Sequence, residues 1–315
     1  TGQIDVELKK PEKTDPLFVN VYQSSDGKTE LNLNLNKVLN PKWSSLLMMH
    51  AGNNQLSMDE NNDSFLDIPH NKQLSLMNRW KFMSLKRVEA MFGVKYIYDD
   101  KQGGQLNFNS MNALIDSVNY GFGLTTQRGE AFLKGSINWP DIPYRSLGLQ
   151  TNLATQNSND YFGLDAYDAT ENNLFANLIY ESIFNNTNHK FRTGLSIIDD
   201  QITSSFRNIQ FNNFNVVPGA FFEYTLTKLE KVTLLLGVRT DYSSEFGFFT
   251  TPRIHLKLMP AHEMTIRLSA GTGTRFTNLF TDFPFIMTTN RSIVISEKLK
   301  PEQAFNVGVN ISKEW

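Results

Sequence analysis

The sequence predicts an all-β protein, an antiparallel transmembrane β-barrel, on three observations. Apolar residues take every second position in many segments, as Leu31, Leu33 and Leu35 do with asparagines between them. The pattern repeats along the whole chain with no competing helical segment, and no window approaches 18 consecutive apolar residues. A period of two gives each strand one apolar and one polar face. Its repetition favours an apolar face turned to lipid and a wet lumen.

Composition narrows the function classes. The 315 residues suffice for one large barrel or two ordinary domains. A mean hydropathy of −0.35 is compatible with a membrane barrel, because its lumen and loops are polar. The chain has no cysteine, which excludes disulfides, thiolate metal sites and cysteine nucleophiles. A formal net charge of −2 gives no basic field, so no nucleic-acid partner is expected.

About 14 segments fit the strand pattern. The first clear alternation begins at Pro16 and turns at Asp26–Gly27. The segment 117–138 counts as one long strand, because a break at Gln127–Gly129 would upset the alternation of short and long links. The hairpin of Thr251–Leu258 and Thr265–Gly271 is the clearest late pair. The predicted strands are 16–24, 29–38, 43–53, 72–83, 87–98, 117–138, 145–157, 172–184, 189–200, 216–228, 231–244, 250–259, 263–275 and 301–315.

The links between these strands alternate in length after the first hairpin. This is expected if tight turns face the periplasm and longer polar links face the outside. The short turns lie near 39–42, 84–86, 139–144, 185–188, 229–230 and 260–262, and the longer links at 54–71, 99–116, 158–171, 201–215 and 276–300.

Aromatic residues gather near the predicted strand ends. Amphipathic rings are stable at the level of the lipid headgroups, so these residues fit a membrane girdle. They fit ordinary strands equally well, because aromatic residues are common in any sheet. The set comprises Trp43, Trp80, Tyr96, Tyr98, Trp139, Tyr144, Phe221, Phe222, Tyr224 and Tyr242.

Several motifs, in this order, resemble the TonB-dependent outer-membrane receptors over nearly the whole chain. Each motif alone is weak, and together they are specific. They are Gly2–Pro11, Asp59–Pro69 followed by Asn78–Trp80, Pro218–Tyr224, Gly237–Tyr242, Thr251–Leu256, Ser269–Phe280 and Leu299–Gly308.

The resemblance implies a fold and a function. Such receptors have about 22 strands around an N-terminal plug domain, and they import a scarce nutrient such as a siderophore, a vitamin or a glycan with energy from the TonB protein. Residues 1–10 would be the last plug strand and 11–315 a partial barrel, with about eight strands missing. The implied location is the outer membrane of a Gram-negative bacterium. The implied partners are outer-membrane lipid, TonB through missing N-terminal segments, and an unidentified small-molecule ligand.

Calcium is the first metal to consider. Asp59, Asn61 and Asp63 have the 1, 3, 5 spacing of an EF-hand loop, but position 6 is serine instead of glycine and position 12 is histidine instead of glutamate. The EF-hand pattern therefore fails. A looser oxygen cage that adds Asp67 on an extracellular loop is one hypothesis, and a solvated acidic loop is the simpler one. No other cofactor is expected.

Hydrolytic chemistry has less support, and no catalytic residue is predicted. His262–Glu263 begins like a zinc motif, but no second ligand follows four residues later. The chain has no Gly-x-Ser-x-Gly elbow. The glycines 271 and 273 lack the Lys-Ser/Thr and the helix of a phosphate loop. The histidines are scattered over different strands and turns, at positions 50, 70, 189, 255 and 262.

Cationic residues on the polar face of the predicted strands are the remaining candidates for a functional site. They would be costly in hydrocarbon, so alternation places them in the lumen. They would line the bore and touch the plug or an anionic ligand such as a metal chelate, or form ion pairs with Asp241, Glu223 or Glu263. The candidates are Arg239, Arg253, His255, Lys257, Arg267 and Arg275.

Two rival functions follow from other interpretations of the same pattern. A soluble β-sandwich that binds a ligand would bury the apolar faces between two sheets. An outer-membrane barrel lipase or protease would gather serine, histidine and an acid on one rim. A hydrolase assay of the full-length protein would detect the activity of such an enzyme.

Overall fold

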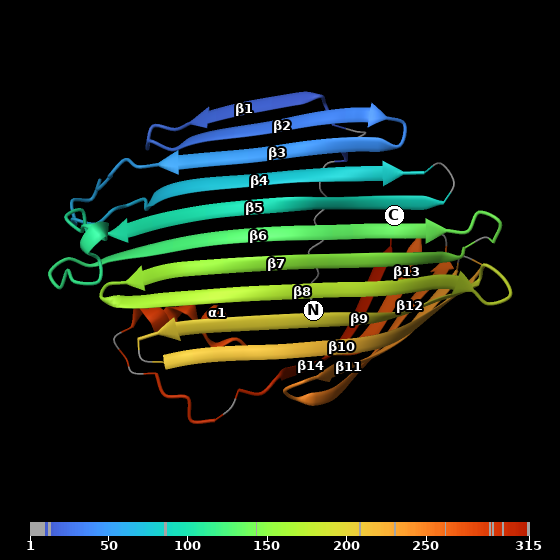
Figure 1. The fold of residues 1–315 in the computed structure, drawn as a ribbon. Coiled ribbons are helices and arrows are strands. Elements are labelled where there is room, and N and C mark those ends of the chain that lie inside the picture. The colour runs from blue at the N-terminus through green and yellow to red at the C-terminus, as the bar shows by residue number, and fades with distance from the viewer. Residues whose placement is uncertain are drawn as a thin grey trace.

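The computed structural model describes residues 10–313 except 12–13, 85–86, 143, 208, 230, 262, 290, 292 and 298. Its strands form one antiparallel sheet of 14 strands, in which each pairs with its neighbours in sequence (Figure 1). The predicted architecture and strand number are confirmed. The strands are β1 Leu17–Gln23, β2 Thr29–Asn40, β3 Trp43–Asn54, β4 His70–Met83, β5 Val88–Gly104, β6 Gly121–Asn138, β7 Ser146–Phe162, β8 Asp165–Ile183, β9 His189–Phe206, β10 Ile209–Lys228, β11 Val232–Ser243, β12 Gly247–Ala261, β13 Met264–Arg275 and β14 Glu302–Lys313.

Cross-strand register turns the alternation of single strands into two continuous faces. Directly opposite residues in an antiparallel pair share a face. Leu256 of β12 lies opposite Leu234 of β11 and Leu268 of β13, and Leu268 lies opposite Val309 of β14. A similar row of apolar residues lies at the other end of the sheet, where Leu33 of β2 is opposite Val19 of β1 and Met49 of β3.

The sheet is strongly curved and open, with β11–β14 turned behind β8–β10 (Figure 1). Its convex face carries the apolar rows, and no other element of the described chain packs over them. Val94, Leu195 and Val309 are 60%, 63% and 66% exposed. All described strands belong to this one sheet, so no second sheet packs on the apolar face as a β-sandwich requires. Lipid is the environment that fits such a face.

Five of the predicted girdle residues pack against other aromatic rings: Trp43, Trp80, Phe222, Tyr224 and Tyr242. Trp43 packs edge-on against Trp80 at 6.5 Å between ring centroids and lies 4.8 Å from Phe82. Tyr224 belongs to a second such cluster with His189. Phe221 is the exception, because its register opposite Arg239 places it on the other, concave face.

The two rims differ in their links. Short turns join strands at one rim, and the links 55–69, 105–120 and 276–301 lie at the other (Figure 1). The prediction of long links at 158–171 and 201–215 is wrong, because β7 to β10 extend almost to their turns. Gly163 (φ 61°) and Arg207 (φ 54°) supply the left-handed residues of those tight turns. Beyond the apolar band the convex face also carries polar residues, such as Asn157, Asn159 and Asp168, so the alternation is lost there.

Two other expectations concern boundaries. The segment 117–138 contains one unbroken strand, β6, as predicted, but this strand begins at Gly121 and residues 117–120 belong to the preceding link. The expected plug strand at 1–10 falls almost entirely outside the described residues. Helical structure in the described part is short: η2 Ser110–Asn112, α1 Leu279–Asp282 and η3 Pro284–Thr288. None of these helices has the length and apolarity needed to cross a membrane.

Candidate functional site

A chain of ion pairs crosses the concave face from β8 to β12. Arg192 Nε donates to Glu181 Oε2 at 2.7 Å, and its Nη1 lies 3.9 Å from Glu223 Oε1. The other carboxylate oxygen of Glu223 contacts Arg253 Nη2. The Glu223 side chain is only 10% exposed, so its charge requires these partners. The bore wall is therefore charged but largely self-neutralised in this region.

Two glycines make room for arginine side chains whose polar contacts span more than one strand. Gly237 of β11 lies between Glu223 and Arg253, and the Arg253 side chain passes over it. A Cβ at Gly237 would lie 2.8 Å from Arg253 Cγ and Nε. On the same face, Gly219 lies opposite Ser196 and Asp241, and a Cβ there would collide with the Asp241 carboxylate. The missing side chains let Arg253 reach Glu223 and let Arg239 Nη2 donate to Ser196 Oγ at 2.7 Å.

Replacing Gly237 by alanine is expected to lower the free energy of unfolding in lipid by about 1–3 kcal/mol, the cost of leaving a buried polar group without its partner. The new methyl group would displace Arg253 and leave Glu223 with Arg192 alone. Equilibrium unfolding in urea in lipid vesicles measures the change. Gly148→Ala on the same face is the control, because its Cβ would lie 3.8 Å from the nearest atom. Equal losses from the two substitutions would contradict this role for Gly237.

Strand register places all six predicted cations on the concave side. Three of them pair with carboxylates, as one of the two predicted roles requires. The other three, His255, Lys257 and Arg267, have no carboxylate within ion-pair distance among the described residues. The three that pair are Arg239 with Asp241 at 2.6 Å, Arg253 with Glu223, and Arg275 with Asp282 and with Glu302 at 3.5 Å.

Residues 276–300 of the link between β13 and β14 fold onto the concave face near the rim of long links, and this segment is named the strap here (Figure 1). Phe280 of α1 is 2% exposed and packs against Tyr167, Phe206 and Phe211, with ring centroids 5.4, 5.9 and 6.3 Å away. Because strand register places these three rings on the charged face, the strap lies inside the curve of the sheet. It therefore covers part of the concave wall at the rim of long links.

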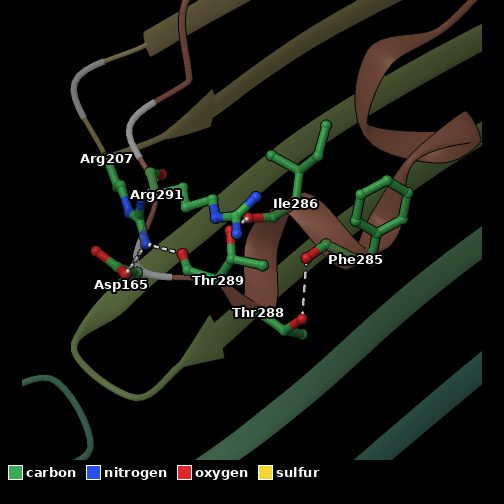
Figure 2. Close-up of polar contacts among 7 residues, drawn as sticks. All are labelled: Asp165, Arg207, Phe285, Ile286, Thr288, Thr289 and Arg291. Atoms are coloured by element: carbon green, nitrogen blue, oxygen red, sulfur yellow. Dashed lines mark hydrogen bonds and ion pairs between the residues drawn. The ribbon is translucent and has the colours of Figure 1, made fainter.

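Arg207 fastens the strap to the turn between β9 and β10 (Figure 2). Its Nη2 donates to Asp165 Oδ2 at 2.7 Å and to the carbonyl oxygen of Thr289 at 2.6 Å. Its Nη1 donates to the carbonyl oxygen of Arg291 at 2.9 Å. Sequence reasoning placed only a long polar link here. The run of large apolar residues around Phe280 was the available signal that this link packs on the protein.

The acidic loop Asp59–Asp67 uses its carboxylates to hold its own backbone. Asp59 accepts from the backbone N–H of Asp63 at 3.0 Å and of Ser64 at 2.9 Å. Asp63 accepts from the N–H of Phe65 at 2.8 Å, and Asp67 from that of Glu60 at 2.7 Å. The Asn61 side-chain amide donates to Asp63 at 2.9 Å. These hydrogen bonds hold the backbone of the loop, and calcium binding by Asp59, Asn61, Asp63 and Asp67 stays a prediction.

The link 105–120 shows the same use of a carboxylate. Asp116 Oδ1 accepts from the backbone N–H groups of Asn119 and Val118, each at 3.0 Å. These hydrogen bonds favour the ionised carboxyl and hold the pKa of Asp116 below its ordinary value. In the described part of the chain, no three His, Asp or Glu side chains gather where they could hold a metal. His262 lies outside the described residues.

Comparison with known proteins agrees with this geometry. No curated protein matches the sequence. Similar solved structures are the copper transporter OprC (TM-score 0.71, 12% identity, 98% of this chain and 52% of that one), the siderophore receptor PiuA from Acinetobacter baumannii (0.68, 10%, 92% and 53%) and the siderophore receptor PirA from Pseudomonas aeruginosa (0.65, 12%, 95% and 52%). At these identities they establish the fold, and the chain spans about half their length.

A family model adds evidence from the sequence itself. The model described as TonB dependent receptor-like, beta-barrel matches residues 90–313, which include β6 to β14 and most of β5. Members of this family lie in the outer membrane of Gram-negative bacteria, where an apolar convex face meets lipid and a charged concave face meets water. The chain belongs to the family of TonB-dependent receptor β-barrels.

Proposed function

We propose that this chain forms part of the wall of an active importer, which takes up a scarce nutrient across the outer membrane with energy from TonB. The observation that carries the proposal is the division of one curved sheet into an exposed apolar face and a charged face. Such a wall needs lipid outside and water inside. The family match supports the same role.

A metal chelate of a siderophore is the first cargo to test, with a vitamin or a glycan as the alternatives. Several similar solved structures are siderophore receptors, which supports this order of testing. Three of the six predicted bore-wall residues, His255, Lys257 and Arg267, have no carboxylate partner among the described residues, which also suits an anionic cargo. The strap would narrow the outer mouth, where a cargo first meets the protein.

Uptake in the native host tests the proposal. Deleting the gene is expected to abolish energy-dependent uptake of one compound among labelled siderophores, cobalamin and oligosaccharides under starvation for that nutrient. Deleting TonB should abolish the same uptake, and restoring the gene should recover it. Unchanged uptake of the whole panel in the deletion strain would refute the import function. Uptake of a vitamin or glycan would change the cargo and keep the mechanism.

The rival functions give different results. A soluble ligand-binding sandwich would fractionate without the membrane and need no detergent. A barrel lipase or protease would hydrolyse its substrate in a purified preparation without TonB.

A further inference from the structure

Lys257 and Arg267 are placed in an unfavourable arrangement on the concave face. They lie directly opposite each other on β12 and β13, and like charges at such positions destabilise a sheet. Thr233 of β11 and Asn310 of β14 complete this row, and both are uncharged. The only hydrogen bond of Arg267 to a described side chain goes from Nη1 to Asn310 Oδ1 at 3.4 Å. The sequence therefore carries a local electrostatic cost at this point.

The neighbouring row adds a third group of the same kind. His255 lies opposite Leu235 and Ser269, and Ser269 lies opposite Gly308. Two residues before His255 on β12, Arg253 is paired with Glu223. The charge of Arg253 is therefore neutralised, in contrast to those of His255 and Lys257. In the described part of β11 to β14, no carboxylate lies within ion-pair distance of His255, Lys257 or Arg267.

A groove of about 410 Å³ opens at this position, and it is named the cationic groove here. Its volume is in the range of small-ligand sites. Gly308 deepens it, because a Cβ there would lie 2.8 Å from Ser269 Oγ. Its polar and charged lining is Thr233, His255, Lys257, Arg267, Ser269 and Asn310.

We propose that the cationic groove binds an anionic oxygen group, a carboxylate or a phosphate. Lys257 and Arg267 supply the charge-assisted hydrogen bonds, and bound negative charge removes the repulsion between them. The His255 ring and the Asn310 and Ser269 side chains can donate at the edges. The inference rests on the proposed function only in requiring a water-filled bore. The anion comes either from a diffusible solute or from an acidic side chain of the protein that enters the bore.

Binding and stability of the full-length protein in detergent test the site. The probes are citrate and inorganic phosphate, and the readouts are titration calorimetry and the thermal unfolding midpoint. The variant is Lys257→Gln combined with Arg267→Gln. The matched control, Lys95→Gln with Arg128→Gln, also removes two concave-face cations, but these lie beside a carboxylate: Lys95 is opposite Glu130, and Arg128 Nε is 2.5 Å from Glu130 Oε1.

Two results support the site and identify the source of the anion. If a solute binds, citrate or phosphate raises the wild-type midpoint, and the variant binds it about tenfold to a hundredfold more weakly, as loss of charged hydrogen bonds predicts. The control variant keeps the wild-type affinity. If an acidic side chain of the protein occupies the groove, the wild type does not respond to either probe, and the variant has a lower midpoint.

The proposal is overturned if neither probe shifts the wild-type midpoint and the variant unfolds at the same or a higher temperature. It is also overturned if the variant retains the wild-type affinity for a probe that binds. These measurements involve no transport, so this failure would leave the uptake results of the import hypothesis intact.

Discussion

Replacing Leu256 by arginine is expected to destabilise the folded protein in lipid by about 2–4 kcal/mol, the cost of a cation on the lipid face near the membrane midplane. Leu256 lies between Leu234 and Leu268 in the apolar row of the convex face. Ile254 and Leu258, two positions away on each side, belong to the same face. An arginine here could reach water only by deforming the bilayer or its own strand.

The neighbouring residue provides the matched control for the face assignment. Lys257→Leu changes the opposite, concave face, where the side chain lines a wet groove. Its effect should stay below about 1 kcal/mol, as for substitutions outside a packed core. Equilibrium folding titrations of both variants in lipid vesicles make the comparison. Equal losses would reject the assignment of the two faces, and with it the membrane orientation of the sheet.

Much of this fold could be predicted from the sequence because one physical rule acts along the whole chain. Alternation in Leu31–Asn36 fixes which side chains share a face, and the register of β1 with β2 preserves that division. The same rule placed Arg239 and Arg253 on the bore side. Whether a residue has an odd or an even position in its strand is sufficient to assign its side chain to a face, because paired residues of neighbouring strands point to the same side of the sheet.

The strand ends could not be predicted in the same way. Alternation needs lipid on one side and water on the other, and this contrast ends at the membrane surface. Beyond it, β7 and β8 continue to the turn at Gly163 with polar residues such as Asn157, Asn159 and Asp168 on the convex face as well. A polar strand and a polar loop then have the same composition. For this reason the predicted links 158–171 and 201–215 were too long.

The contacts within the candidate site could not be predicted from the sequence, because they depend on how the strands are arranged in space. Parity predicts that Arg253 and Glu223 face the bore, but these residues lie on strands separated by β11. Their contact requires the missing side chain at Gly237. The cationic groove likewise becomes visible only when register sets Lys257 opposite Arg267. Sequence alone indicates the charges but not which of them are neutralised.

Docking of the strap depends most strongly on Phe280. Replacing it by alanine is expected to weaken the packing of residues 276–300 on the concave face by about 3–5 kcal/mol, as for loss of a buried phenylalanine. The ring is 2% exposed and fills the space between three aromatic side chains of β8, β9 and β10. Its removal should leave a cavity that the rigid strands cannot close.

Hydrogen exchange and limited proteolysis of the strap in the full-length protein measure this loss. Phe280→Ala should speed exchange and cleavage within 276–300 and leave the strands of the sheet protected. Phe285→Ala in the same strap is the control, because this side chain is 63% exposed and its loss should change the docking by less than about 0.5 kcal/mol. Arg207→Met should show an intermediate effect, since it removes the three hydrogen bonds at the turn and the contact of the guanidinium with the Phe206 ring, 4.9 Å to the centroid, but leaves the Phe280 side chain in place. If both phenylalanine variants exchange at the wild-type rate, the aromatic cluster is not what holds the strap, and the outer mouth must be shaped by other contacts.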